Sequence, residues 1–110
     1  MDDATLWQAI AEVERGLVDA DLGGGVVKQR IAGRGGGKSS GYRTIVLFRF
    51  TQRAVFVYGF GKNERDNIRQ DELIEFRRLA AVILAYGDDE ISTALTTGAL
   101  MEVIDEQAVS

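Results

Sequence analysis

The chain has 110 residues, 45% of them hydrophobic, a formal net charge of -4, and neither cysteine nor histidine. This length fits one domain over residues 1–110, and the missing cysteines exclude disulfides, thiolate chemistry and the usual zinc sites. No apolar run approaches the roughly 18 residues of a membrane span, and Asp2 and Asp3 stand where a signal peptide is positive, so we expect a cytoplasmic protein without membrane contact.

An amphipathic helix is predicted over residues 3–21. Its apolar positions recur at helical spacing and form one stripe: Leu6, Ile10, Val13 and Leu17. We expect Trp7, beside this stripe, to lie in the core. Three acids are expected on the opposite, water-facing side: Glu12, Glu14 and Asp19. Three consecutive glycines from Gly23 then end the helix, because glycine adopts the backbone conformations that a sharp turn needs.

Residues 26–31 alternate with a period of two, which predicts a strand that presents Lys28 and Arg30 on the same face. The glycine-rich stretch at 33–39 then resembles a phosphate loop. However, only three residues separate its first glycine from its Gly-Lys-Ser, where a Walker A loop has four, and a β-type run follows instead of a helix. We therefore expect no nucleotide hydrolysis, and a basic loop of this kind favours contact with a phosphate backbone.

Two apolar runs, residues 44–50 and 54–60, are joined by a short polar link and predict an antiparallel hairpin. Both faces of each run are largely apolar, so we expect central strands covered on both sides. Because the first strand starts where the second ends, four cations should meet at one end of the sheet and form an anion site: Lys38, Arg43, Lys62 and Arg65. Tyr42 and Phe60 lie near this end and could stack on a base, whereas the other aromatics of the hairpin are expected in the core.

Residues 70–86 carry an apolar stripe at helical spacing and predict a second helix, which Gly87 ends. A short third helix is predicted through Leu95, followed by an apolar run at 100–104 that either adds a strand or docks on the sheet. The expected fold class is α+β. It consists of a small antiparallel sheet of three central strands, with the carboxy-terminal run as an optional fourth, packed against helices.

Charge is segregated along the chain. Residues 22–70 hold ten cations and two acids, whereas residues 1–21 hold one cation and six acids, and residues 71–110 hold two cations and nine acids. Because salt screens charges over about 8 Å, the middle of the chain can present a positive surface despite the negative net charge. Two interpretations stay open: a site for a polyanion, or a basic sheet edge that the acidic helices neutralise by intramolecular pairing.

Three ordered motifs occur along the middle of the chain. They read Asp-Ala-Asp-Leu-Gly-Gly-Gly-Val-Val-Lys-Gln-Arg at 19–30, Gly-Lys-Ser-Ser-Gly-Tyr-Arg-Thr at 37–44 and Gly-Lys-Asn-Glu-Arg-Asp-Asn-Ile at 61–68. On these motifs the chain resembles, over about residues 6–86, the RelE/HigB-type toxins of bacterial type II toxin–antitoxin systems. The resemblance implies a compact α+β fold, cleavage of mRNA in the ribosomal A site with inhibition of translation, and a cognate antitoxin of the helix-turn-helix type as partner.

Two departures from the family's pattern bear on this expectation. Family members usually begin with a strand and a helix that precede the equivalent of the Thr5–Leu22 helix, and we expect both to be missing here. The sheet edge left open would be covered by the carboxy-terminal run, by a second protomer in a homodimer, or by the antitoxin. In addition, a family arginine that is important for activity falls at Asn63, which carries no charge.

Cleavage of RNA by its own 2′-hydroxyl needs a base, an acid and cations around the phosphate, and this chain has no histidine to move the proton. Lysines packed among other cations can act as bases, so Lys28 or Lys38 is the expected base. Arg43 and Arg65 would hold the non-bridging oxygens, and Lys62 would protonate the leaving oxygen.

Four further residues are expected to contact the RNA: Arg30, Arg34, Tyr42 and Phe60. We expect no cofactor and no metal ion. Acids are rare among the basic residues, where only Glu64 and Asp66 are present, and two carboxylates alone do not form a good metal site.

Two other functions remain open. A ParE-like gyrase inhibitor would act through its carboxy-terminal helix, and it would damage DNA rather than cut mRNA. A truncated, inactive relative would serve as a dimer or as an antitoxin-binding module. Its mass in solution, together with a toxicity test in cells, would identify it.

Overall fold

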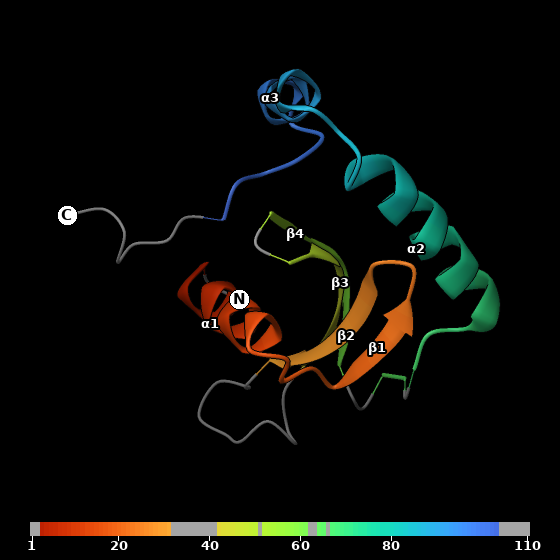
Figure 1. Ribbon diagram of the computed structural model, residues 1–110. Coiled ribbons are helices and arrows are strands. Elements are labelled where there is room, and N and C mark those ends of the chain that lie inside the picture. Colours follow the sequence, from red (N-terminus) through yellow and green to blue (C-terminus); the bar gives the residue numbers. More distant parts are fainter. Residues whose placement is uncertain (1–2, 32–41, 51, 62–63, 66, 104–110) are drawn as a thin grey trace.

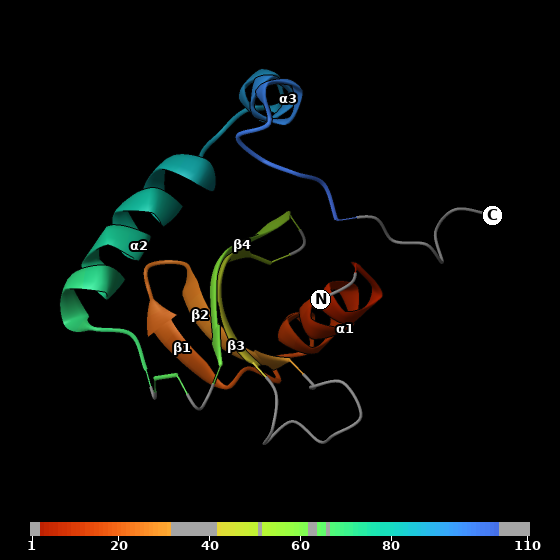
Figure 2. The same ribbon diagram turned by 180° about the vertical axis from the view of Figure 1, so that it is seen from behind.

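A computed structural model describes residues 3–31, 42–50, 52–61, 64–65 and 67–103. Seven elements follow one another along the chain: α1 (Asp3–Glu14), β1 (Ala20–Gly23), β2 (Val26–Ile31), β3 (Tyr42–Arg49), β4 (Arg53–Gly61), α2 (Gln70–Ile83) and α3 (Asp88–Thr97). The strands form one antiparallel sheet in the order β1-β2-β3-β4. The helices α1 and α2 lie on opposite sides of this sheet, as the two views in Figure 1 and Figure 2 show. The predicted α+β class is confirmed.

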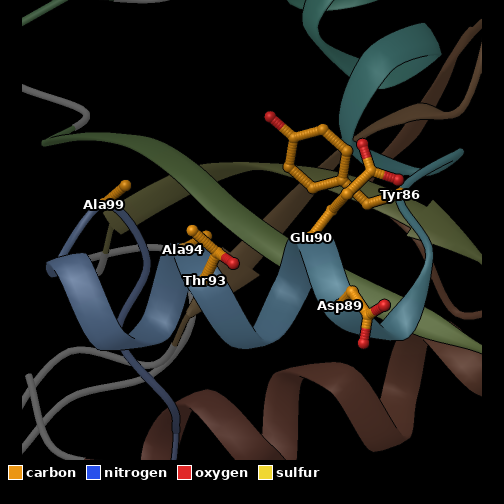
Figure 3. Close-up of a pocket in the computed structure, with 6 residues that line it drawn as sticks. All are labelled: Tyr86, Asp89, Glu90, Thr93, Ala94 and Ala99. Atoms are coloured by element: carbon orange, nitrogen blue, oxygen red, sulfur yellow. The ribbon is translucent and has the colours of Figure 1, made fainter.

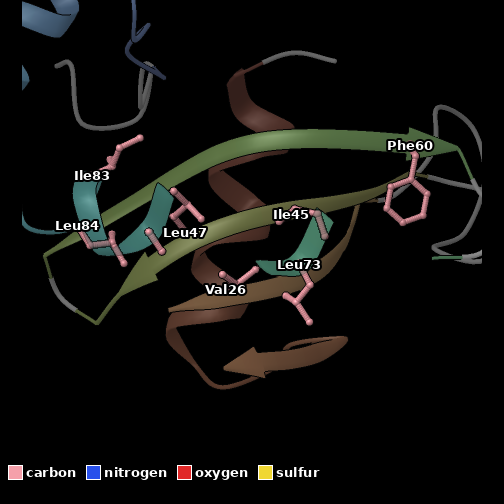
Figure 4. Close-up of a cluster of buried hydrophobic side chains, with 8 residues drawn as sticks. Val26, Ile45, Leu47, Phe60, Leu73, Ile83 and Leu84 are labelled. Carbon is pink, nitrogen blue, oxygen red and sulfur yellow. The ribbon is translucent and has the colours of Figure 1, made fainter. Parts of the chain in front are cut away.

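Two hydrophobic clusters fill the space between the sheet and these helices. Alternate residues of the central strands, among them Ile45 and Leu47, pack against Leu73 and Ala80 of α2 (Figure 4). The intervening Val46 packs on the other face, against Val13 of α1. Burying one such side chain contributes about 1.5–3 kcal/mol. The prediction that both strands of the hairpin are central and covered on both faces is confirmed for β3 and wrong for β4, which is an edge strand of the sheet and is largely half-buried.

The amino-terminal helix is shorter than predicted. It ends at Glu14, and Gly16 has a φ of 78°, a conformation that breaks the helix and that a side chain would resist. Leu17, predicted to continue the apolar stripe, is 58% exposed. Residues 20–23 are a strand, so the three glycines from Gly23 form the turn of the β1–β2 hairpin instead of ending a helix. The fourth strand of the sheet is therefore β1 and not the carboxy-terminal run.

Two side chains of α1 lie differently from the prediction. Trp7 is not in the core but 39% exposed, and its Nε1 donates to the carbonyl of Val103 at 3.0 Å. Glu12 does not face water but is buried, and its Oε2 accepts from Nε2 of Gln29 at 3.2 Å. The reason is that β2 places the amide of Gln29 on the face covered by α1, where a buried donor needs an acceptor.

The predicted second and third helices are present. Arg53 stabilises the end of α2, because its Nη1 donates to the carbonyls of Ile83 at 2.7 Å and Tyr86 at 3.0 Å. Residues 101–103 form no strand, and the hydrogen bond from Trp7 to Val103 shows that this segment docks on α1. Among the described helices, none is both long enough and apolar enough to cross a membrane.

Candidate functional site

The register of the sheet gathers predicted site residues on one face. Lys28 lies opposite Ile45, Arg30 opposite Arg43, and Arg43 opposite Phe60. Since directly opposed residues of an antiparallel pair share a face, the two arginines stand side by side on the face that α2 covers further along. Two like charges in this arrangement repel each other, so the pair needs a counter-charge.

The counter-charge is the carboxylate of Asp19, which directly precedes β1. Its Oδ1 lies 3.0 Å from Nε of Arg30, and its Oδ2 lies 3.3 Å from Nε of Arg43 and 3.7 Å from Nζ of Lys28. The side chain of Asp19 is 15% exposed and that of Arg43 11%, whereas Arg30 is 44% exposed. Among the described residues, three cations thus share one carboxylate, which leaves this Asp19 cluster with a formal surplus of two positive charges.

Asp19 is held from the other side of the sheet. Its backbone N–H donates to Oε1 of Gln29 at 3.2 Å. The amide nitrogen of Gln29 donates in turn to Glu12 at 3.2 Å and to the carbonyl of Leu17 at 3.1 Å, and Gln29 is 1% exposed. Because buried polar chains of this kind are costly to break, the position of Asp19 is fixed by the fold.

Arg43 is only partly satisfied in this arrangement. Its Nε contacts Asp19, but among the described residues no hydrogen-bond partner reaches its buried Nη1. A guanidinium nitrogen without a partner costs free energy when it is buried. The Asp19 cluster therefore retains unused donor capacity as well as unused charge.

Arg65 is satisfied in a different way. It donates to both oxygens of Glu72, at 2.5 and 3.2 Å, to the Tyr58 hydroxyl at 3.2 Å and to the carbonyl of Asn67 at 2.9 Å. The guanidinium carbon also lies 5.8 and 5.7 Å from the ring centroids of Tyr58 and Phe60, within the range of a cation–π contact. Arg65 thereby ties the segment after β4 to the first turn of α2.

Glu72 also accepts a hydrogen bond at the start of α2. Its Oε1 accepts from the backbone N–H of Arg69 at 2.7 Å, where α2 begins. The hydrogen bonds from Arg65 and from the Arg69 backbone hold the pKa of Glu72 at about 2, and the pKa of Arg65 is raised by its hydrogen bonds to Glu72 and Tyr58. Arg69 lies 3.8 Å from Glu72 and 3.1 Å from Asp71, so two arginines meet two carboxylates and the charges around the Arg65–Glu72 pair match.

The two aromatic residues predicted to stack on a base lie in different surroundings. Tyr42 is 45% exposed, but the alternation of β3 puts it on the face opposite to Arg43. Phe60 is 2% exposed and belongs to the core under α2 (Figure 4). Its ring contacts Arg65 and leaves no open face on which a base could stack. The prediction that Phe60 stacks on a base is therefore wrong, because the strand register places its side chain opposite Arg43 and toward the interior.

The structure therefore brings together Lys28, Arg30 and Arg43, and it places Arg65 over the ring of Phe60, next along the same face. The other predicted cations, Lys38, Lys62 and Arg34, lie outside the described residues, as does Asn63.

Sequence reasoning missed both carboxylates of this face. The helical spacing predicts Asp19 on the water side of a helix that runs through residue 21, but α1 ends at Glu14 and Asp19 directly precedes β1. The signal that could have found it is the triple glycine after Asp21, which is equally typical of a hairpin turn and brings Asp19 beside Gln29. The interpretation that acidic helices neutralise the basic residues describes Arg65, which pairs with Glu72 of α2. It does not describe Arg43, whose partner Asp19 lies before β1 and on no helix.

Two cavities of the described part of the chain lie away from these cations. One cavity of about 410 Å³ is lined by α3 and its neighbours, including the acids Asp89 and Glu90 (Figure 3). Another, of about 580 Å³, lies between α1, the start of β4, α3 and the segment at 99–103, and Trp7 and Leu95 line it. Neither contains a predicted site cation. Among the described residues, no three carboxylates gather closely enough to hold a metal ion.

Comparison with known proteins gives one finding. The model of a family described as the RelE toxin of the RelE / RelB toxin-antitoxin system matches residues 1–103. No curated protein and no solved structure matches the chain. The match spans every described helix and strand and includes α1. The expected loss of a strand and a helix before α1 stays a prediction.

Proposed function

The chain belongs to the RelE toxin family of RelE/RelB toxin–antitoxin systems, and from this premise we propose that it is a ribosome-dependent endoribonuclease that cleaves mRNA without a metal ion. Cleavage inhibits translation, and a cognate antitoxin of the helix-turn-helix type holds the toxin inactive. The observation that carries the proposal is the surplus of positive charge in the Asp19 cluster.

The chemistry of RNA cleavage requires such a surplus. When the 2′-hydroxyl attacks the neighbouring phosphate, a second negative charge develops on the non-bridging oxygens. Arg43 and Lys28 lie 3.3 and 3.7 Å from the same carboxylate oxygen, so both can reach one phosphate oxygen that takes its place. Preorganised cations stabilise the transition state most where little water is present, and both side chains are at most 15% exposed.

The remaining roles follow the residues' chemistry. Because Lys28 holds the phosphate as a charged ammonium, Lys38 is the base that takes the proton of the attacking hydroxyl, and Lys62 returns a proton to the leaving 5′-oxygen. Arg30, the most exposed cation of the Asp19 cluster, together with Arg34 binds the adjoining backbone. Arg65 can contact a phosphate when its guanidinium leaves Glu72, or when it binds Glu72 and the phosphate at the same time.

Replacing Arg43 tests this function. We expect Arg43→Ala to abolish growth arrest and to lower ribosome-dependent mRNA cleavage by about 100-fold or more, the usual loss for one transition-state donor. Arg78→Ala is the matched control, because Arg78 is an exposed arginine on α2 that pairs with Glu75. If a folded Arg43→Ala protein arrests growth and cuts mRNA as the natural chain does, the catalytic proposal is wrong.

A second candidate is an inactive relative that binds the antitoxin or dimerises. The complete pairing of Arg65 with Glu72 favours it, because a predicted phosphate ligand is then occupied internally. Assays of growth arrest and mRNA cleavage with the natural chain distinguish the active toxin from the inactive relative. An inactive relative neither arrests growth nor cuts mRNA, and a ParE-like gyrase inhibitor would instead leave mRNA intact and damage DNA.

A further inference from the structure

We propose that Asp19 is a positioning residue whose carboxylate occupies, in the free protein, the place of an RNA phosphate. This inference deepens the proposed function, on which it rests. It assigns to the cluster of Lys28, Arg30 and Arg43 a defined ligand, a backbone phosphate, and to Asp19 the role of holding the three cations ready until that phosphate displaces it.

The geometry around the carboxylate is that of an anion site with an internal anion in it. Each Asp19 oxygen lies at 3.0–3.7 Å from cationic nitrogens, and these nitrogens come from two neighbouring strands. Each arginine uses its Nε here, and the buried Nη1 of Arg43 stays without a partner among the described residues. A phosphate has more oxygens than a carboxylate and carries them tetrahedrally, so it can satisfy donors that Asp19 leaves unused.

The anchor behind Asp19 shows that its place is built into the fold. The hydrogen bond from its backbone N–H leads to Gln29, which is 1% exposed, and from there to Glu12 on α1. These hydrogen bonds fix the backbone, whereas the carboxylate's contacts with described residues are those to the three cations. The side chain can therefore turn away while the strand stays in place.

This arrangement has two physical consequences. Without Asp19, Arg30 and Arg43 would stand opposed as like charges and would spread apart, so the carboxylate lowers the cost of assembling the site before RNA arrives. Conversely, the carboxylate competes with small anions. Free phosphate should bind the natural chain poorly, whereas an RNA strand held by further contacts can displace the carboxylate.

The test uses inorganic phosphate as the probe and thermal unfolding of the purified chain as the readout. In chloride, we expect Asp19→Asn to unfold at a lower temperature than the natural chain. Millimolar phosphate at the same ionic strength should raise the midpoint of Asp19→Asn by about 5 °C and leave the natural chain unchanged. The matched control is Asp21→Asn, since Asp21 lies two residues away and its Oδ1 accepts from the backbone N–H of Gly23, outside the Asp19 cluster. This variant should not respond to phosphate.

Each outcome decides the question. A midpoint of Asp19→Asn that does not respond to phosphate, or an equal response of the natural chain, overturns the proposal. If Asp19→Asn does not fold, the double variant Asp19→Asn/Arg30→Met replaces it, because its cluster has the same surplus charge as the natural one; it should show a smaller phosphate-specific rise, and no rise overturns the proposal. The measurement needs no ribosome, so phosphate binding with no mRNA cleavage would refute the proposed function alone.

Discussion

Arg43 and Arg65 lie on the same face of one sheet, yet their surroundings differ in the ratio of carboxylates to cations. Arg65 and the nearby Arg69 have two carboxylates between them, Glu72 and Asp71. The Tyr58 hydroxyl and the carbonyl of Asn67 use further donors of Arg65. Arg43 shares Asp19 with Lys28 and Arg30. A matched pair is complete without a ligand and stabilises the fold, whereas an unmatched cluster gains most when an anion binds. The comparison separates a structural arginine from one suited to substrate.

The same distinction applies to other arginines of the chain. Arg53 donates to carbonyls at the end of α2, and its side chain is thereby committed to holding this helix on β4. Arg77, on α2, donates to the carbonyl of Leu22 and connects the helix to the β1–β2 hairpin. Local positive charge by itself is therefore a poor guide to function, because several cations serve as helix caps or interelement ties.

After Arg43→Ala, the largest expected effect comes from removing a second cation of the Asp19 cluster. Lys28→Met should lower ribosome-dependent cleavage by about 100-fold, because the phosphate loses one of its charged donors, while the chain stays folded. Arg49→Met is the control, since Arg49 lies at the far end of β3 and its Nη1 contacts Gln52. Equal cleavage by both variants would break the distinction between matched and unmatched cations.

A smaller effect is expected from Glu72→Gln, which removes the charge from the matched pair. The folded-state pKa of Glu72, about 2, lies below its ordinary value of 4.5. Its stabilisation is therefore fully present above pH 4.5 and is lost as the pH falls toward 2. The natural chain should unfold at a higher temperature than Glu72→Gln at pH 7, and the two midpoints should converge on acidification. A gap that stays constant from pH 7 to 2 would contradict this assignment.

The smallest effect is expected at an exposed matched pair. Arg78 and Glu75 lie at 2.9 Å on the surface of α2, with side chains 73% and 68% exposed. Such pairs contribute about 0.2–1 kcal/mol or less, because water and salt screen them. Glu75→Gln should therefore change the free energy of unfolding by less than about 0.5 kcal/mol in a denaturant titration. A larger loss would mean that one-to-one pairing alone, and not its partial burial, stabilises this fold.

Much of the fold could be predicted from the sequence because the responsible signals are local. The alternation of β-branched and aromatic residues in β2, β3 and β4 predicts strands, and the short link before Arg53 predicts their hairpin. The apolar stripe of α2 likewise predicts a helix, and the three ordered motifs indicate the family. From these elements, the meeting of Lys28, Arg30 and Arg43 near one sheet end follows in outline.

The extent of α1 and the partners of the cations were decided by tertiary structure. Leu17 continues the helical spacing of α1, but residues 20–23 form a strand that pairs with β2, and the helix ends at Glu14. That change moves Asp19 from a solvated helix face to the centre of three cations. Sequence determines which charges the chain carries and where its strands form. Which carboxylate meets which cation depends on strand register and helix packing, because ion pairs act over a few ångströms between residues far apart in the chain.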